Sequence, residues 1–181
     1  MRKKILMVLA LVILVSSISL VAATPSVFDI GLVNAYSIGS LMGQDFAAYT
    51  PGIRLSGYLC KWFGLSLDVA VEAPFADLEA DEFGLEVVAD AVFRYPFGLV
   101  EPYLAVGPAY RMAVGATEFV VAEEVLLSAR AGLDFNILPM LGVGIEARHF
   151  MDLPLLVADT EAYAEGALDN TKVAITIKAK F

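Results

Sequence analysis

The feature that most constrains the fold of this chain is an alternation of apolar and polar residues with a period of two. In residues 65–73, LSLDVAVEA, Leu65 and Leu67 alternate with Ser66 and Asp68. This period places the two kinds of side chain on opposite faces of a β-strand. The same pattern recurs in seven other segments, at residues 27–37, 52–60, 85–94, 102–111, 126–135, 141–150 and 172–181. The sequence therefore predicts eight strands.

The composition places these strands in a membrane. Hydrophobic residues make up 59% of the chain, charged residues only 18%, and the mean hydropathy is +0.72. Such a chain is too apolar for an ordinary soluble domain, and with a net charge of −9 it is no candidate for binding nucleic acid. After residue 24 no apolar run reaches the roughly 20 residues of a membrane helix, whereas a tilted strand of about ten residues crosses the hydrocarbon layer. The expected fold class is all-β, an eight-stranded antiparallel, up-and-down transmembrane β-barrel.

The connections between the predicted strands alternate in length. The short segments KWFG, YPFGLVE and NILPM join the second to the third, the fourth to the fifth and the sixth to the seventh strand. The other four connections run from 11 to 21 residues. Outer-membrane barrels have short turns on the periplasmic side and long loops outside. This arrangement predicts both termini in the periplasm.

Charged residues on the predicted strands all fall on the face opposite the large apolar residues. They are seven acids and eight bases: Asp29, Arg54, Asp68, Glu72, Glu86, Asp90, Arg94, Arg111, Arg130, Asp134, Glu146, Arg148, Lys172, Lys178 and Lys180. Small residues such as Gly31, Ala70 and Gly107 share that face, as a narrow lumen requires. We therefore expect the charged face to line the lumen as an ion-pair network and the apolar face to contact lipid.

A lipocalin-like barrel, with an apolar interior and a polar exterior, has the same alternation. The small residues on the charged face argue against it, because a face exposed to solvent is not crowded. The aromatic residues also gather near the two ends of the strands, in the pattern of bilayer interfaces. Pro108 interrupts the fifth strand, where we expect a bulge or the end of pairing.

The start of the chain has the pattern of a secretory signal peptide. Arg2, Lys3 and Lys4 precede an apolar run, and the small residues of the sequence VAA end at Ala23. This order of basic, apolar and small residues predicts cleavage near residue 23. A retained transmembrane helix is the alternative, which the serines at residues 16–19 disfavour. The expected organisation is a signal peptide at residues 1–23 and one barrel at residues 24–181.

The sequence offers little for catalysis or metal binding. A single cysteine, Cys60, and a single histidine, His149, cannot form a zinc site by themselves. Asp68 and Glu72, four residues apart on one strand, are about 13 Å apart, too far to share a proton or an ion. We expect Cys60 to be a small filler on the lumen side and His149 to point towards lipid near the outer interface. No catalytic residue, metal or cofactor is predicted.

The long connections are acidic and partly apolar. They carry thirteen Asp and Glu residues and no Lys or Arg, while Lys61 and Glu101 fall in short turns. The segments VGATEFVV and DLPLLVADTEAYAEGALDN are more apolar than a solvated rim needs. Either the strands extend above the membrane, or the loops pack as a cap or offer a binding surface.

The last predicted strand carries a recognisable pattern. Val173, Ile175, Ile177 and Ala179 alternate and lead to Phe181 at the end of the sequence. This resembles the C-terminal signal of bacterial outer-membrane β-barrels, which in that family is recognised by the barrel-assembly machinery and periplasmic chaperones. Together with the leader and eight strands, the chain resembles the small barrels of the OmpA transmembrane domain, OmpX and OmpW. The segments EPYLAVGPAYR and GIEARHF are similar to strands of that group.

The resemblance implies a multi-pass protein of the bacterial outer membrane with outer-membrane lipid as its surroundings. We expect a non-enzymatic structural or surface-interaction role, exerted through the long acidic loops on an extracellular ligand that the sequence does not name. One alternative is a narrow, porin-like conduit for small apolar molecules or ions, as the likeness to OmpW implies. The other is a lipid-modifying barrel enzyme.

Overall fold

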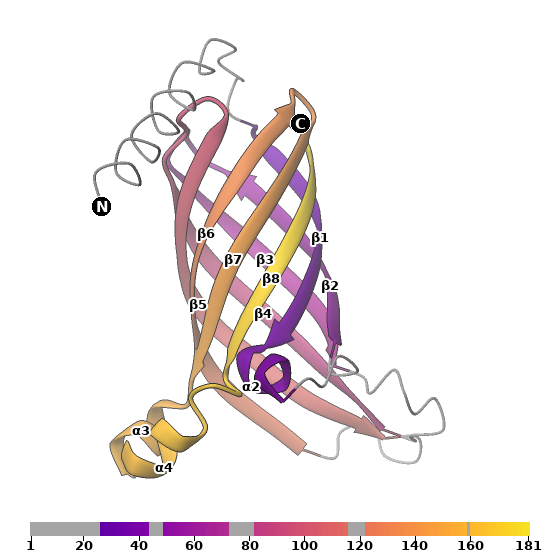
Figure 1. Ribbon diagram of the computed structural model, residues 1–181. Helices are drawn as coiled ribbons and strands as arrows, with labels where there is room; N and C mark the ends of the chain where they lie inside the picture. Colours follow the sequence, from indigo (N-terminus) through magenta and orange to yellow (C-terminus); the bar gives the residue numbers. More distant parts are fainter. Residues whose placement is uncertain (1–25, 44–48, 73–81, 116–121, 159) are drawn as a thin grey trace, which may run out of the picture.

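The chain forms a closed barrel of eight antiparallel strands in sequence order (Figure 1). The computed structural model describes residues 26–43, 49–72, 82–115, 122–158 and 160–181, so the expected leader at residues 1–23 lies outside the described residues. The strands are β1 Phe28–Ser37, β2 Tyr49–Tyr58, β3 Phe63–Glu72, β4 Glu82–Arg94, β5 Val100–Gly115, β6 Ala122–Leu138, β7 Leu141–Met151 and β8 Thr171–Lys180. The predicted fold class is confirmed.

The barrel closes where the first strand meets the last. In the β1–β8 ladder Asp29 lies opposite Lys180 and Ala35 opposite Ala174. Phe181 extends this closure, because its backbone N–H donates to the carbonyl of Phe28 at 2.8 Å. Closure pairs the backbone groups of the wall and removes sheet edges, which is the only way a sheet can span a hydrocarbon layer.

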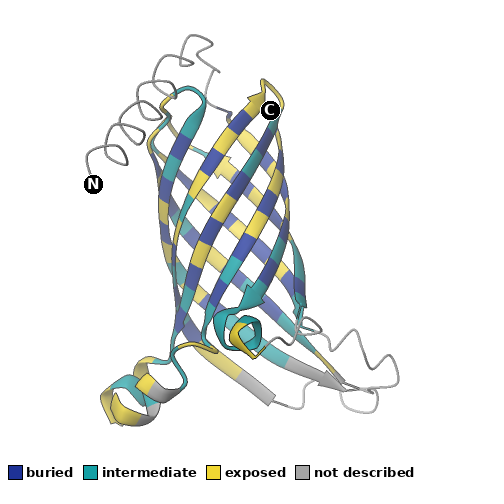
Figure 2. Ribbon diagram, in the orientation of Figure 1, coloured by how far each residue is buried: buried dark blue, intermediate teal, exposed yellow. Residues whose placement is uncertain are grey.

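Burial alternates along every strand, as the sequence pattern predicts (Figure 2). Most inward side chains are buried, whereas many outward ones are large, apolar and exposed, with Leu65 and Ile175 each 56% exposed. A continuous apolar surface of this extent is not stable in water and calls for an apolar surrounding. No helix among the described residues has the length and apolar character to cross a membrane.

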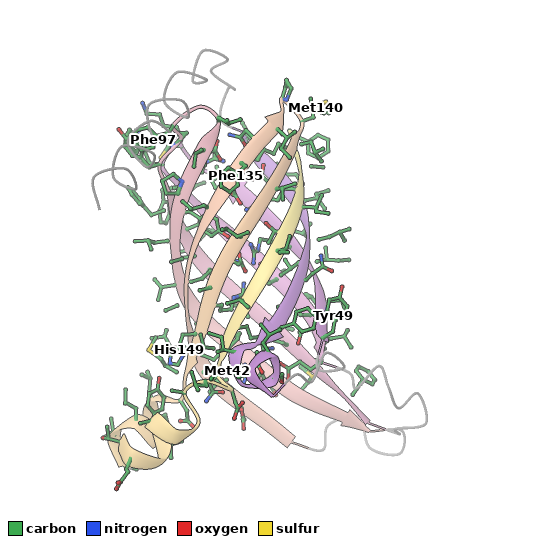
Figure 3. All side chains as sticks on the ribbon, viewed as in Figure 1. Met42, Tyr49, Phe97, Phe135, Met140 and His149 are labelled. Atoms are coloured by element: carbon green, nitrogen blue, oxygen red, sulfur yellow. The ribbon has the colours of Figure 1, made fainter. Side chains whose placement is uncertain are left out.

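The two ends of the barrel differ. At the short-turn end lie the turns 59–62, 95–99 and 139–140 and the C terminus, and Phe97, Phe135 and Met140 mark this end in Figure 3. Aromatic rings contact one another there, with the Trp62 and Tyr95 centroids 4.7 Å apart. The opposite end, the loop end, carries the helices α2 Ile38–Met42, α3 Leu153–Ala158 and α4 Thr160–Glu165.

Three strands extend further at the loop end than the alternation predicts. β5 continues to Gly115 and β6 begins at Ala122, so the strands reach into or up to both ends of the VGATEFVV segment, whose residues 116–121 lie outside the described residues. Glu82, Glu123 and Glu124, which we expected in connections, therefore lie in strands. The strands on both sides of this segment are thus longer than the alternation predicts, which agrees with the alternative of strand extension. We call the projecting part of β4, β5 and β6 the protruding sheet.

Pro108 breaks the ladder on one side only. Towards β4 the pairs Val88↔Ala109 and Ala91↔Val106 flank a gap, whereas towards β6 the pair Pro108↔Leu127 is kept. Beside the proline, a Cβ on Gly107 would overlap the backbone carbonyl of Ala89. The fifth strand thus continues past the proline. The expected interruption of pairing occurs only on the side of β4.

Candidate functional site

The lumen is filled by charged side chains that meet across the barrel. At its middle, Arg54 of β2 uses both edges of its guanidinium group. Its Nε and Nη2 donate to the Asp68 carboxylate at 2.8 and 2.7 Å, and its Nη1 and Nη2 donate to the Glu146 carboxylate at 2.7 and 2.8 Å. Arg54 is only 2% exposed. Paired bonds of this kind are the geometry in which arginine binds carboxylates most strongly.

Two further arginines share the same carboxylates. Arg130 Nη1 lies 3.0 Å from Asp68, and Arg148 also pairs with Asp68. Arg130 Nη2 is 3.1 Å from Asp90, and Arg148 Nη1 is 3.5 Å from Glu86. We call the group formed by Arg54, Asp68, Arg130, Glu146 and Arg148 the central cluster. Its members come from β2, β3, β6 and β7, so it joins walls that are not neighbours in the sheet.

A second group lies at the loop end of the lumen. Lys172 Nζ is 2.9 Å from Glu86 and also pairs with Glu72, while Arg111 Nε is 3.2 Å from Glu86. Arg111 also lies 4.1 Å above the ring of Phe150, which is fully buried. Phe150 packs with Val88, Ala109 and Leu126 next to these ion pairs. Our sequence analysis did not single out Phe150, although it lies two residues after Arg148 and therefore on the same inward side of β7 as Glu146 and Arg148.

A third group lies near the short-turn end. Lys178 Nζ is 2.5 Å from Asp134, and Lys180 Nζ is 3.1 Å from Glu101. Arg94 lies 3.3 Å from the ring centroid of Tyr58 and 3.8 Å from Glu101. The expected place of Glu101 in a short turn is wrong. β5 begins at Val100, so Glu101 is inward and only 3% exposed.

Glu101 also completes the charge balance of the lumen. The predicted network held seven acids and eight bases, and with Glu101 the described lumen holds eight of each, buried except for the half-buried Glu72 and Arg111. Asp29, the remaining member, is buried opposite Ser56 and Lys180 in the strand ladders, and its carboxylate forms no ion pair with the described residues. A buried charge is tolerated when it is paired. The interior is therefore neutral as a whole.

Little free volume remains between these groups. A cavity of about 20 Å³ lies beside Asp68, Glu86 and Lys172, and another of about 10 Å³ lies beside Arg54 and Asp134. Each has room for about one water molecule. A much larger depression of about 980 Å³ lies on the outside of the wall, lined by apolar residues such as Leu104, Ala131 and Ile145. The barrel is therefore plugged inside.

Tyr103 holds the central cluster from β5. Its hydroxyl donates to Glu146, and Lys178 lies 4.8 Å from its ring centroid. Replacing Tyr103 by phenylalanine is expected to cost about 1–3 kcal/mol, because a buried carboxylate loses a donor. Urea unfolding in lipid vesicles measures this loss. The same substitution at Tyr95, which is 40% exposed at the short-turn end, serves as the control and is expected to change little. Equal losses at both positions would contradict the role of the hydroxyl.

His149 is the one histidine and lies on the outside of the wall (Figure 3). Its Nδ1 is 2.8 Å from Thr171 Oγ1 and its Nε2 is 2.5 Å from the hydroxyl of Tyr163 in α4. The Thr171 hydroxyl donates to the carbonyl of Ala167 at 2.6 Å. Its only hydrogen is therefore used, so in the neutral ring Nδ1–H donates to Thr171 and Nε2 accepts from Tyr163. The histidine does not take the proton of Thr171 in this arrangement. It fastens α4 to the wall.

Cys60 does not have the expected inward position. β2 ends at Tyr58, and Cys60 is exposed in the turn that follows. The backbone N–H groups of Leu59 and Cys60 both donate to the carbonyl of Phe63, which tightens this turn and ends the alternation. The thiol is therefore free for labelling and is no part of the lumen.

Comparison with known proteins gives matches of structure only. No family model matches the chain, and no curated protein matches its sequence. The N-terminal β-barrel domain of Pseudomonas aeruginosa OprF superposes with a TM-score of 0.58 at 12% identity, covering 85% of this chain and 96% of that domain. Neisserial surface protein A superposes with a TM-score of 0.51 at 13% identity, covering 85% and 94%. A designed transmembrane β-barrel reaches 0.50 at 16% identity, covering 87% and 98%.

The chain has the fold of the small outer-membrane β-barrels. At these identities the likeness concerns the fold and no particular activity. That a designed barrel superposes about as well as a natural one indicates that strand number and alternation, and not shared side chains, define this fold.

Proposed function

We propose that this chain is a non-enzymatic protein of the bacterial outer membrane, with periplasmic termini, and that it presents the protruding sheet at the cell surface on a plugged barrel. The observation that carries the proposal is the combination of a neutral, ion-paired lumen with an apolar exterior. A plugged interior serves as a support, whereas a conduit needs a path. The barrel-assembly machinery would recognise the β8 residues Val173, Ile175, Ile177 and Ala179, with Phe181.

The protruding sheet supports a role in surface contact. Within the described residues, β6 has no partner on the β7 side before Leu127, where pairing with Met151 begins. The backbone of Ala122–Leu126 therefore presents an edge beyond the barrel. An open edge of this kind can accept an extended segment of another protein as an added strand. Val125, 72% exposed on this stretch, would supply an apolar contact.

Planar-bilayer recording tests the plugged lumen. We expect the purified chain to insert without a steady conductance, because the central cluster and Phe150 obstruct the lumen at two levels. The variant Phe150→Ala with Arg111→Ala opens the loop-end level only and is expected to stay closed at the central cluster. A steady conductance of the unmodified chain would contradict the interpretation that the lumen is plugged, and would favour the conduit alternative.

Cell adhesion tests the contact surface. Cells that display the chain are expected to adhere to immobilised host matrix proteins above cells with an empty vector. Shortening the hairpin between Tyr110 and Leu126 to a tight turn removes the β5 and β6 parts of the protruding sheet, together with Arg111 at the loop end of the lumen, so adhesion is expected to fall to the vector level. Surface display of both forms is checked by antibody against an added tag. Undiminished adhesion of the shortened form would exclude the protruding sheet as the contact surface.

A further inference from the structure

The depression on the outside of the wall follows the pairing of the strands. It has a volume of about 980 Å³, and its outward lining residues form two adjacent rows that run from strand to strand. In the first row each residue is the ladder partner of the next: Phe93, Leu104, Ala131, Ala147, Val173 and Tyr36. The second row, from Tyr95 to Asn34, lies two residues away along the chain in each case. We call the space between these rows the wall furrow.

Small residues in the middle of the first row leave room in the wall furrow. Ala131 of β6 and Ala147 of β7 are ladder partners, and both face outward. Beside them in the second row stand the larger side chains of Leu133 and Ile145. On the opposite side of the barrel, outward positions of β2 and β3 carry large side chains such as Leu67. The wall furrow is thus a feature of the side formed by β6 and β7.

The wall furrow crosses the apolar outer surface of the barrel, the apolar belt, at an oblique angle. The strands of a barrel are inclined to its axis, as Figure 1 shows, and the rows run across the strands. One end of the first row is Phe93, near the short-turn end of β4, and the other is Tyr36, near the loop end of β1. The furrow therefore passes through the apolar belt from one aromatic residue to another.

One polar side chain lies near the loop end of the wall furrow. Asn34 faces outward in β1, and its Oδ1 accepts a hydrogen bond from the hydroxyl of Tyr49. Among the described residues, its Nδ2 group has no hydrogen-bond partner. Hydrogen-bond donors on an apolar surface are costly unless they find an acceptor. The occupant of the furrow is therefore expected to carry an acceptor at this end.

A second copy of the chain and an acyl chain are the two occupants that an apolar furrow in a membrane could take. Two copies in one membrane share their orientation, so they are related by a rotation about the membrane normal. Their facing furrows are then inclined in opposite directions and cross, so the rows of one copy cannot lie along the furrow of the other. A flexible acyl chain can follow the oblique course. The geometry therefore favours lipid.

We propose that the wall furrow is a binding site for one acyl chain of a membrane lipid, which lies over Ala131 and Ala147 while its ester carbonyl accepts a hydrogen bond from Asn34 Nδ2. This inference rests on the proposed membrane location of the barrel. An apolar lining with a few polar groups that fix the orientation of the ligand is the usual form of a small-molecule site. Because Asn34 lies towards the loop end, the bound lipid belongs to the outer leaflet.

A quenching titration tests the proposal on the full chain. In a Cys60→Ser background, a single cysteine carries a fluorophore at Val106, beside the furrow, or at Leu67, on the opposite side of the barrel. Both residues face outward and are exposed. The protein in detergent micelles is titrated with phosphatidylcholine that is spin-labelled on one acyl chain. We expect quenching at Val106 to saturate at one lipid per chain, and quenching at Leu67 to rise slowly without saturation.

Substitutions at outward positions test the furrow itself. Ala131→Phe fills it and is expected to abolish the saturable quenching at Val106. Asn34→Leu removes the donor and is expected to weaken binding about three- to tenfold. Ala179→Phe is the matched control, because Ala179 is an exposed outward alanine of β8 that does not line the furrow, and it is expected to leave binding unchanged. Circular dichroism checks that each variant folds.

Vesicles separate the possible failures. In phosphatidylcholine vesicles that contain the same spin-labelled lipid, both probes are expected to be quenched, and quenching at neither would contradict the membrane location itself. Quenching of both probes in vesicles without a saturable component at Val106 in micelles overturns the binding site and leaves the membrane location in place. The proposal is also overturned if the saturable quenching is equal at Val106 and Leu67, if it survives Ala131→Phe, or if only a spin-labelled free fatty acid produces it.

Discussion

Replacing Arg54 by alanine is expected to lower the free energy of unfolding by about 3–5 kcal/mol, because it leaves two buried carboxylates without their main partner. Asp68 keeps Arg130 and Arg148, but Glu146 keeps only Tyr103 and arginine contacts of 3.9 Å. Urea unfolding in lipid vesicles, followed by the fluorescence of the single tryptophan, measures the loss.

The same substitution at Arg111 is the matched control. The Arg111 side chain is 17% exposed, against 2% for Arg54, and it lies near the loop end of the lumen. Water there can replace part of the lost interaction, so a clearly smaller loss is expected. Equal losses would show that position within the lumen does not matter. A loss below about 1 kcal/mol for Arg54→Ala would mean that the central cluster contributes no more than exposed ion pairs do.

An arginine at Ile145 is expected to cost about 2–4 kcal/mol in a bilayer, the range for a charge on the lipid face near the midplane of a barrel. Ile145 lies midway along β7, points outward and is 52% exposed. In water, an exposed isoleucine would accept this change with little effect on stability. The substitution therefore tests whether the exterior faces lipid.

Val125→Arg is the control for position along the barrel axis. Val125 is 72% exposed, also points outward, and lies on the protruding sheet beyond the belt. Its expected cost is about 0–1 kcal/mol, since charges near or beyond the interface are tolerated. Unfolding of both variants by urea in the same vesicles gives the comparison. Similar small costs at both sites would contradict the placement of the wall in lipid.

Much of the wall could be predicted from the sequence because alternation is a local signal. Shifting the pairing of a strand by one residue would turn all its lumen charges towards lipid. Each strand can therefore have only one side facing the lumen. This is why the inward side of Arg54, Asp68 and Glu146 follows from parity alone. Which charges meet does not follow, because Arg54 and Glu146 are 92 residues apart and their contact depends on the stagger of the closed barrel.

The loop end was less predictable. Strand extension in β5 and β6 escapes the pattern because outside the membrane both faces meet water, so the selection for alternation is relaxed. The predictions for Glu101 and Cys60 were wrong because both residues lie next to turns. The alternation of inward and outward side chains stops in a turn, so it does not show where the strand begins or ends. Helices α3 and α4 are too short for a helical period to be recognised against the background.

The cross-links in the middle of the lumen restrict the order in which the protein can be assembled. Arg54, Asp68 and Glu146 belong to the second, third and seventh strands, so their charges cancel only when the early and late parts of the chain have come together. If single hairpins entered the hydrocarbon core one at a time, their charged side chains would be unpaired there, at a high cost in free energy. Insertion is therefore expected to be concerted, with closure and charge cancellation occurring in one cooperative step.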